Sequence, residues 1–105
     1  MVINLQIKPL SINAAFQGRR FKTKEYINYE KKVLLMLPKC DLQPFSVIKI
    51  TYGFSNMASD IDNPTKLIVD IMQKKYGFND KEILEMHLYK KKVKKGEEYI
   101  NIIVG

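Results

Sequence analysis

Alternating apolar and polar residues predict four strands. Residues 2–8 alternate until Pro9, which ends the first strand. Residues 45–54 also alternate and are rich in β-branched and aromatic residues, so they give the clearest strand. The alternation returns within residues 83–93, after one irregular turn, and residues 98–104 form the last predicted strand.

Apolar residues at helical spacing predict two helices. The first helix begins after Thr23, a residue type that caps helices, and runs until the next proline. The second helix begins after Asp62 or Asn63, either of which is suited to cap it, and Pro64 fits its first turn. Gly77 lies just beyond its expected end.

The connections complete the predicted fold. Residues 10–22 are expected to form a long loop, and residues 94–97 a hairpin turn between the last two strands. The order of elements is therefore β-α-β-α-β-β. Helical crossovers beside a terminal hairpin imply a mixed sheet with both helices on one face. The expected fold class is α+β, in a single small domain that spans residues 1–105.

Composition excludes several classes of protein. No apolar run approaches the roughly 18 residues of a membrane span, and the first residues lack the apolar stretch of a signal peptide. Cys40 and His87 are the single residues of their types, which excludes an intrachain disulfide, a cysteine-based zinc site and a histidine cluster. We expect an inert or partly buried Cys40 thiol and a structural His87. These exclusions leave a small intracellular domain as the expectation, and its net charge of +7 favours a polyanionic partner.

The aspartates are concentrated against this positive charge. Four of the five lie within residues 60–80. In an extended segment Asp60 and Asp62 would project to the same side, and Asp80 would return to that place from the loop after the second helix. Gathered carboxylates repel one another unless a divalent cation binds, and oxygen ligands favour Mg²⁺ or Mn²⁺. The pattern therefore suggests metal-assisted attack of water on a phosphodiester, with Lys66 stabilising the transition state.

Simpler explanations exist for the same aspartates. A D-x-D before a helix is also typical of a turn followed by a helix cap. Lys66 and Asp70 are at i,i+4 spacing and form an ordinary surface pair in that interpretation. Asp80 would then cap the following turn.

Positive charge gathers in two segments. The first is residues 17–24, and the aromatic residues Phe16 and Phe21 beside its basic residues either stack on exposed bases or pack in the core. In residues 90–95, a run of lysines either attracts DNA or protects a sheet edge from aggregation. The residues that we predict to bind DNA are Arg19, Arg20, Lys22, Lys24, Lys74 and Lys75.

A set of short motifs spans almost the whole chain. They are KPLSIN at 8–13, GRRFKTKEY at 18–26 and DIDNPTK at 60–66, followed by Asp70 and the pair at 79–80. Together they resemble the RusA family of Holliday junction resolvases, which are common in bacteriophages and prophages.

The resemblance implies roles for individual residues. It implies that Asp60, Asp62 and Asp80 are the essential metal-binding carboxylates, that Lys66 is the active-site lysine and that Asp70 is a further acidic candidate. The family often has two consecutive acids at the distal position, whereas here an asparagine precedes Asp80. This difference leaves open which of the two side chains faces the metal. The resemblance also implies a homodimer, whose two-fold symmetry offers one site for each strand that is cut.

We therefore expect a Mg²⁺-dependent endodeoxyribonuclease, with Mn²⁺ as a substitute and no organic cofactor. It would resolve four-way DNA junctions by paired symmetric nicks, during recombination and repair in the bacterial cytoplasm. Three alternatives stay open: a basic nucleic-acid-binding module without catalysis, a nuclease that prefers flaps or forks, and a protein-interaction domain in which the aspartates only cap and turn.

Overall fold

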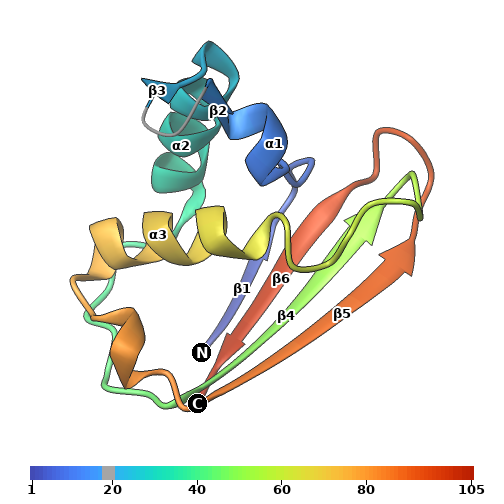
Figure 1. Cartoon of the computed structure of the whole chain (residues 1–105). Coiled ribbons are helices and arrows are strands. Elements are labelled where there is room, and N and C mark those ends of the chain that lie inside the picture. The colour runs from blue at the N-terminus through green and yellow to red at the C-terminus, as the bar shows by residue number, and fades with distance from the viewer. Residues whose placement is uncertain (18–20) are drawn as a thin grey trace.

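Four strands form a mixed sheet in the order β1-β6-β4-β5 in the computed structural model, which describes residues 1–17 and 21–105 (Figure 1). Their bounds are Val2–Leu5 for β1, Val47–Phe54 for β4, Glu85–Lys92 for β5 and Tyr99–Val104 for β6. Strand β4 pairs parallel with β5 and antiparallel with β6, which pairs antiparallel with β1. The predicted α+β class and mixed sheet are confirmed.

In the described part of the chain, three α-helices lie on one face of this sheet: α1 (Ile12–Ala15), α2 (Lys24–Met36) and α3 (Thr65–Tyr76) (Figure 1). Alternate residues of β4, such as Ile48 and Ile50, are fully buried in the core together with Leu67 and Ile71 of α3. No helix among the described residues is long and apolar enough to cross a membrane.

The segment predicted as a long loop contains more structure than expected. It includes α1 and a two-stranded ribbon made of β2 (Phe16–Gln17) and β3 (Phe21–Lys22). Helix α1 is capped by Ser11, whose side chain accepts a hydrogen bond from the Ala14 amide. Thr23 caps α2 as predicted, and its hydroxyl also donates to the Ala14 carbonyl at 2.7 Å. These short-range caps give structure to a stretch that lacks a clear hydrophobic period.

The predicted cap of α3 is wrong, although the predicted end of the helix is confirmed. Pro64 occupies the N-cap position, and no side chain caps the helix. Asp62 contributes its backbone carbonyl instead, which accepts a hydrogen bond from the Thr65 amide at 3.2 Å. At the other end, Gly77 adopts φ 76°, a left-handed conformation that suits glycine.

The predicted hairpin between the last two strands is also wrong. A turn does form over residues 94–97, where the Glu97 amide donates to the Lys94 carbonyl. However, β4 lies between β5 and β6, so the turn carries the chain across the end of β4. The crossover through α3 places β5 parallel to β4 on one edge, and β6 therefore pairs on the other edge. Glu98 fixes this connection by accepting hydrogen bonds from the Ser55 hydroxyl and the Gly96 amide.

Candidate functional site

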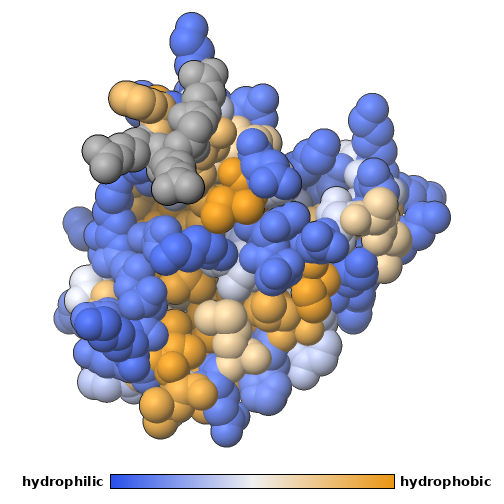
Figure 2. Space-filling view, in the orientation of Figure 1, coloured by the Kyte–Doolittle hydropathy of each residue, from blue (hydrophilic) through white to orange (hydrophobic). Residues whose placement is uncertain are grey.

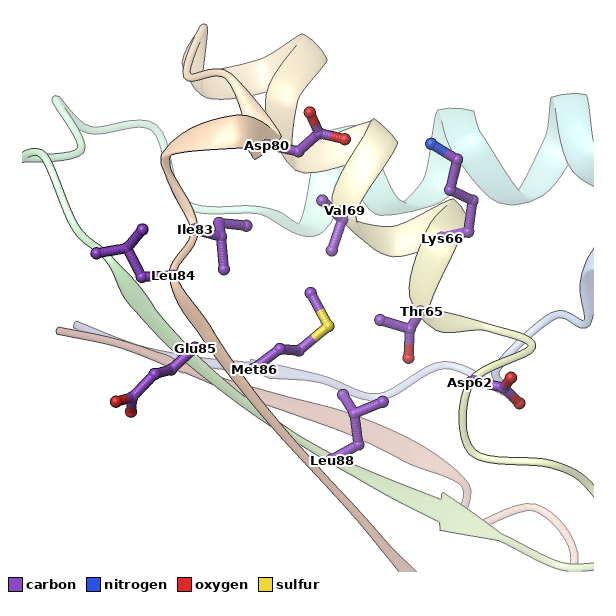
Figure 3. A pocket seen from close by; sticks show the side chains of 10 residues that line it. All are labelled: Asp62, Thr65, Lys66, Val69, Asp80, Ile83, Leu84, Glu85, Met86 and Leu88. Carbon is purple, nitrogen blue, oxygen red and sulfur yellow. The ribbon is translucent and has the colours of Figure 1, made fainter.

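A hollow of about 390 Å³ opens between α3 and β5 (Figure 3). Four charged residues line it: Asp62, Lys66, Asp80 and Glu85, the last of which directs its side chain away from α3 (Figure 3). The rest of its lining is mainly apolar and includes Val69, Ile83, Leu84, Met86 and Leu88. Figure 2 shows hydrophobic surface on this face of the molecule, bordered by hydrophilic residues. The arrangement therefore places charged groups beside an apolar floor.

The first turn of α3 is fixed to the sheet by buried hydroxyl groups. The Tyr52 hydroxyl of β4 lies 2.7 Å from the Thr65 hydroxyl. Thr65 in turn donates to the Ile61 carbonyl at 3.0 Å. Because these residues flank Asp62 and precede Lys66, the contacts hold that part of the hollow in place.

Lys90 holds the loop that leads into the aspartates. Its Nζ donates to the carbonyls of Met57 and Ser59 at 2.9 and 3.1 Å. Sequence reasoning assigned this lysine only to a basic edge and missed its positioning role. The contact spans more than thirty residues of sequence, so no local pattern indicates it.

A short 3-10 helix, η1 (Asp80–Glu82), presents Asp80 to the hollow. Asn79 caps this turn, since its side-chain oxygen accepts from the Lys81 amide at 3.0 Å. The Asp80 amide donates to the side-chain oxygen of Gln73 at 2.7 Å, which fastens the turn to α3. The asparagine thus has a capping role, and the acid that follows it lines the hollow. Gln73 is a second positioning residue that sequence reasoning missed.

Asp70 lies on α3 in a network of side chains. Its Oδ1 accepts from Lys66 Nζ at 3.4 Å and from Gln73 Nε2 at 3.3 Å. The i,i+4 pair that the sequence allowed is therefore present. Asp70 contacts a residue that lines the hollow, and it also contacts the glutamine that fastens η1.

The structure places Asp60 apart from Asp62. Asp60 lines a different hollow, of about 110 Å³, together with Asn13 and Asn63. The expectation that alternate residues would project to one side holds for an extended chain, whereas residues 61–64 form a bend and a turn. Within residues 1–17 and 21–105, no group of three acidic, histidine or cysteine side chains is close enough to hold a metal ion. Asn13 belongs to a motif that the sequence analysis noted without assigning it a role.

Asp62 and Asp80, which lie in the larger hollow, each have the chemistry that suits a hydrated magnesium ion. Mg²⁺ prefers oxygen ligands, keeps several of its waters and is often bound through one or two carboxylates together with substrate phosphate. Asp62 and Asp80 are both exposed and offer such oxygens, but they lie at opposite ends of the 12-residue helix α3, too far apart to bind one ion directly (Figure 3). Either acid therefore fits this cation as a single carboxylate ligand, with waters and substrate phosphate as the other ligands.

The predicted DNA-binding residues have different surroundings. Arg19 and Arg20 lie outside the described residues, and Lys24 is exposed. Lys22 and Lys74 both pair with Glu30, at 3.2 and 3.0 Å. The remaining candidate, Lys75, donates to the Leu34 carbonyl at 3.1 Å.

The ion pairs of Glu30 affect its titration. Its partial burial favours the neutral acid, but the hydrogen bonds and charges of Lys74 and Lys22 outweigh this effect and lower the pKa of Glu30. Part of the positive charge of these two lysines is therefore compensated within the protein itself.

The two phenylalanines of the basic segment have different environments. Phe16 packs edge-on against Tyr26, with the ring centroids 5.3 Å apart. Phe21 is 73% exposed. Core packing therefore explains Phe16, whereas Phe21 is accessible to a ligand.

The lone cysteine and histidine are both exposed. Cys40 is not partly buried as expected, because it follows Pro38 in the exposed loop between α2 and β4. His87 Nε2 lies 3.3 Å from the carboxylate of Glu85, on the exposed strand β5. Neither residue lines the hollow that contains Asp62.

Comparison with protein-family models finds no family that matches the chain. No curated protein matches it either.

Proposed function

We propose that this protein is a Mg²⁺-dependent, structure-specific endodeoxyribonuclease of the RusA type. It would resolve four-way DNA junctions by paired symmetric nicks, as a homodimer in the bacterial cytoplasm. The observation that carries this proposal is the hollow that Asp62, Lys66 and Asp80 share. It places carboxylates that can bind a metal in the same hollow as a lysine that can contact phosphate.

The residues of the hollow have complementary roles in phosphodiester hydrolysis. Asp62 or Asp80 would hold the metal, and Mg²⁺, when bound, would supply Lewis acidity to a phosphate oxygen and would lower the pKa of a water. Lys66 is exposed on the rim and places a positive charge where the phosphate would lie. Its contact with Asp70 at 3.4 Å orients the ammonium group. Attack of water at phosphorus would then form one phosphorus–oxygen bond and break another, leaving a phosphate on one end of the cut strand and a hydroxyl on the other.

The charge distribution supports a nucleic-acid substrate. The chain carries a net charge of +7 despite its cluster of aspartates. Exposed lysines are present on α2, at the η1 turn and along the second half of β5, including Lys24, Lys81 and Lys91. Contacts from such lysines to phosphate supply affinity that does not depend on base sequence and that falls as salt rises.

A panel of labelled DNA substrates tests this proposal. Four-way, three-way, flap and linear duplexes are incubated with the protein, with Mg²⁺ or with a chelator. We expect Mg²⁺-dependent paired nicks in the four-way junction and little cleavage of linear duplex. Preferred cleavage of flaps or forks would replace the junction specificity with another branched substrate. No cleavage of any substrate would overturn the proposal.

One observation favours a second candidate function, a basic nucleic-acid-binding module without catalysis. Asp60 lines a different hollow from Asp62 and Asp80, so the three predicted ligands are not gathered in this arrangement. Salt-sensitive binding of DNA in the panel, with no cleavage in Mg²⁺ or Mn²⁺, would support this candidate.

A further inference from the structure

Strand β5 forms an edge of the sheet in the described chain, and it is exposed on both faces. Seven of its eight residues are exposed, and Leu88 is half-buried. Apolar side chains are among the exposed ones: Met86 is 42% and Tyr89 is 51% exposed, and Leu84, just before the strand, is 80% exposed. Such an edge is a template for pairing with another strand.

The backbone of β5 is suitably oriented for this pairing. The Val93 amide donates to the Phe54 carbonyl of β4 at 2.9 Å, so Val93 directs its backbone groups toward β4. Successive residues of a strand direct these groups to opposite sides. The backbone groups of Met86, Leu88 and Lys90 therefore point away from β4, toward the free edge.

The charges along β5 favour one orientation of a partner strand. Glu85 lies at its start and three lysines, residues 90–92, lie at its end. A second β5 in parallel would place lysines against lysines, whereas an antiparallel second β5 would place the acidic start against the basic end. Lys90 adds little repulsion, because its Nζ is directed to the carbonyls of Met57 and Ser59.

From these observations we infer that β5 pairs antiparallel with β5 of a second copy of this chain, about a two-fold axis at Leu88. In this register Glu85 lies opposite the partner's Lys91. Both side chains lie on the face of the sheet away from the helices. They alternate in step with His87, which pairs with the exposed Lys49 of β4. Such a two-fold contact is self-complementary, as a symmetric dimer requires.

The pairing has a consequence for the candidate site. A two-fold axis perpendicular to the sheet keeps the helices of both copies on the same side, so the two hollows open toward that side. The exposed side chains of Leu84 and Met86 then border the second copy. The use of this arrangement for paired nicks rests on the proposed function, whereas the interface itself is tested by mass rather than by cleavage.

Charge-swap variants test the interface. Light scattering during gel filtration should give twice the 12.3 kDa mass of the chain for the unmodified protein. Glu85→Lys and Lys91→Glu each place like charges at both contacts of the dimer, so each variant alone should dissociate at least about tenfold more readily. An equimolar mixture of the two variants restores both opposite-charge contacts and should form a heterodimer. The double variant should dimerise with itself for the same reason. Lys95→Glu, in the exposed turn, is the matched control and should leave the dimer intact.

Other outcomes would overturn the inference. A monomeric unmodified protein at about 100 μM, far above the Kd of a specific dimer, would show that no such interface forms. A dimer that neither single variant weakens would place the interface elsewhere. Single variants that stay monomeric when mixed, although circular dichroism shows them folded, would contradict the proposed register. If the unmodified protein forms the dimer but cleaves no DNA junction, only the proposed function is contradicted.

Discussion

The hydroxyl oxygens of Tyr52 and Thr65 lie 2.7 Å apart, and both residues are buried. Because the single hydroxyl proton of Thr65 is donated to the Ile61 carbonyl, Tyr52 is the donor in this bond. Burial raises the pKa of Tyr52 above its usual range, even though the bond to Thr65 acts in the opposite direction, so the phenol remains protonated. The central strand thereby positions the turn that leads from Asp62 into α3.

The variant Thr65→Val should lower the free energy of unfolding by about 1–3 kcal/mol, because it leaves the buried Tyr52 hydroxyl without its acceptor. Urea denaturation measures this change. The double variant with Tyr52→Phe removes both polar groups and should recover part of the loss. Equal stability of Thr65→Val and the unmodified protein would show that the bond does not hold the turn.

The variant Lys90→Met should reduce single-turnover cleavage of a four-way junction by about tenfold or more, because the loop before Asp60 loses its anchor. Lys92→Met is the matched control, since Lys92 is an exposed lysine of the same strand. The control should change the affinity for the junction at low salt but not the rate at which bound junction is cleaved. The same rate for both variants would contradict a positioning role for Lys90.

The variant Glu30→Gln should have an effect on stability that depends on pH. The pKa of Glu30 is lowered in the folded protein, so its ion pairs stabilise the fold above the unfolded pKa of about 4.3. This contribution is lost as pH falls through the folded pKa. We expect the variant to be about 1 kcal/mol less stable at pH 7, and the difference to become smaller as the pH falls to about 3. Urea denaturation at both pH values tests this, and a difference that is unchanged at low pH would contradict the assignment.

The same variant should also change DNA binding. Removal of the Glu30 charge frees Lys22 and Lys74 from their ion pairs, at 3.2 and 3.0 Å. If these lysines contact phosphate, the affinity for junction DNA should rise severalfold at low salt, and its salt dependence should steepen. Fluorescence anisotropy at several salt concentrations measures both quantities. Unchanged affinity and salt dependence would exclude these two lysines from the DNA-binding surface.

The variant Phe21→Ala should weaken DNA binding by about 1–3 kcal/mol with little effect on stability, because this ring is 73% exposed and available to stack on a base. Phe16→Ala is the matched control. It should instead destabilise the fold by about 2–4 kcal/mol, because Phe16 packs against Tyr26. Anisotropy and thermal unfolding separate the two effects, and unaltered DNA affinity of Phe21→Ala would remove it from the binding surface.

Much of the fold could be predicted from local patterns. Alternation identified the strands, and Thr23 and Gly77 marked the start of one helix and the end of another. The order of the strands could not be predicted from the turn at residues 94–97, because pairing depends on which edge of β4 the crossover through α3 leaves open. Local chemistry suited a hairpin, and tertiary packing decided against it.

The candidate site was predictable only in part. Asp62, Lys66 and Asp80 share one hollow because they lie at the ends and on the surface of one helix. Asp60 departs from the prediction because the chain bends directly after it. The anchoring contacts of Lys90 and Gln73 join segments that no sequence spacing relates, so only the structure shows them.

Single-turnover cleavage by Asp80→Asn is the most direct test of the central claim. The assay uses a saturating amount of protein, a four-way junction and Mg²⁺, with Asp41→Asn as the control because Asp41 is exposed and lies outside the hollow. We expect Asp80→Asn to bind the junction at least as tightly as the unmodified protein but to cleave it at least about a hundredfold more slowly. The control should cleave at an unaltered rate. Cleavage by Asp80→Asn at the unmodified rate would show that Asp80 is not part of the active site.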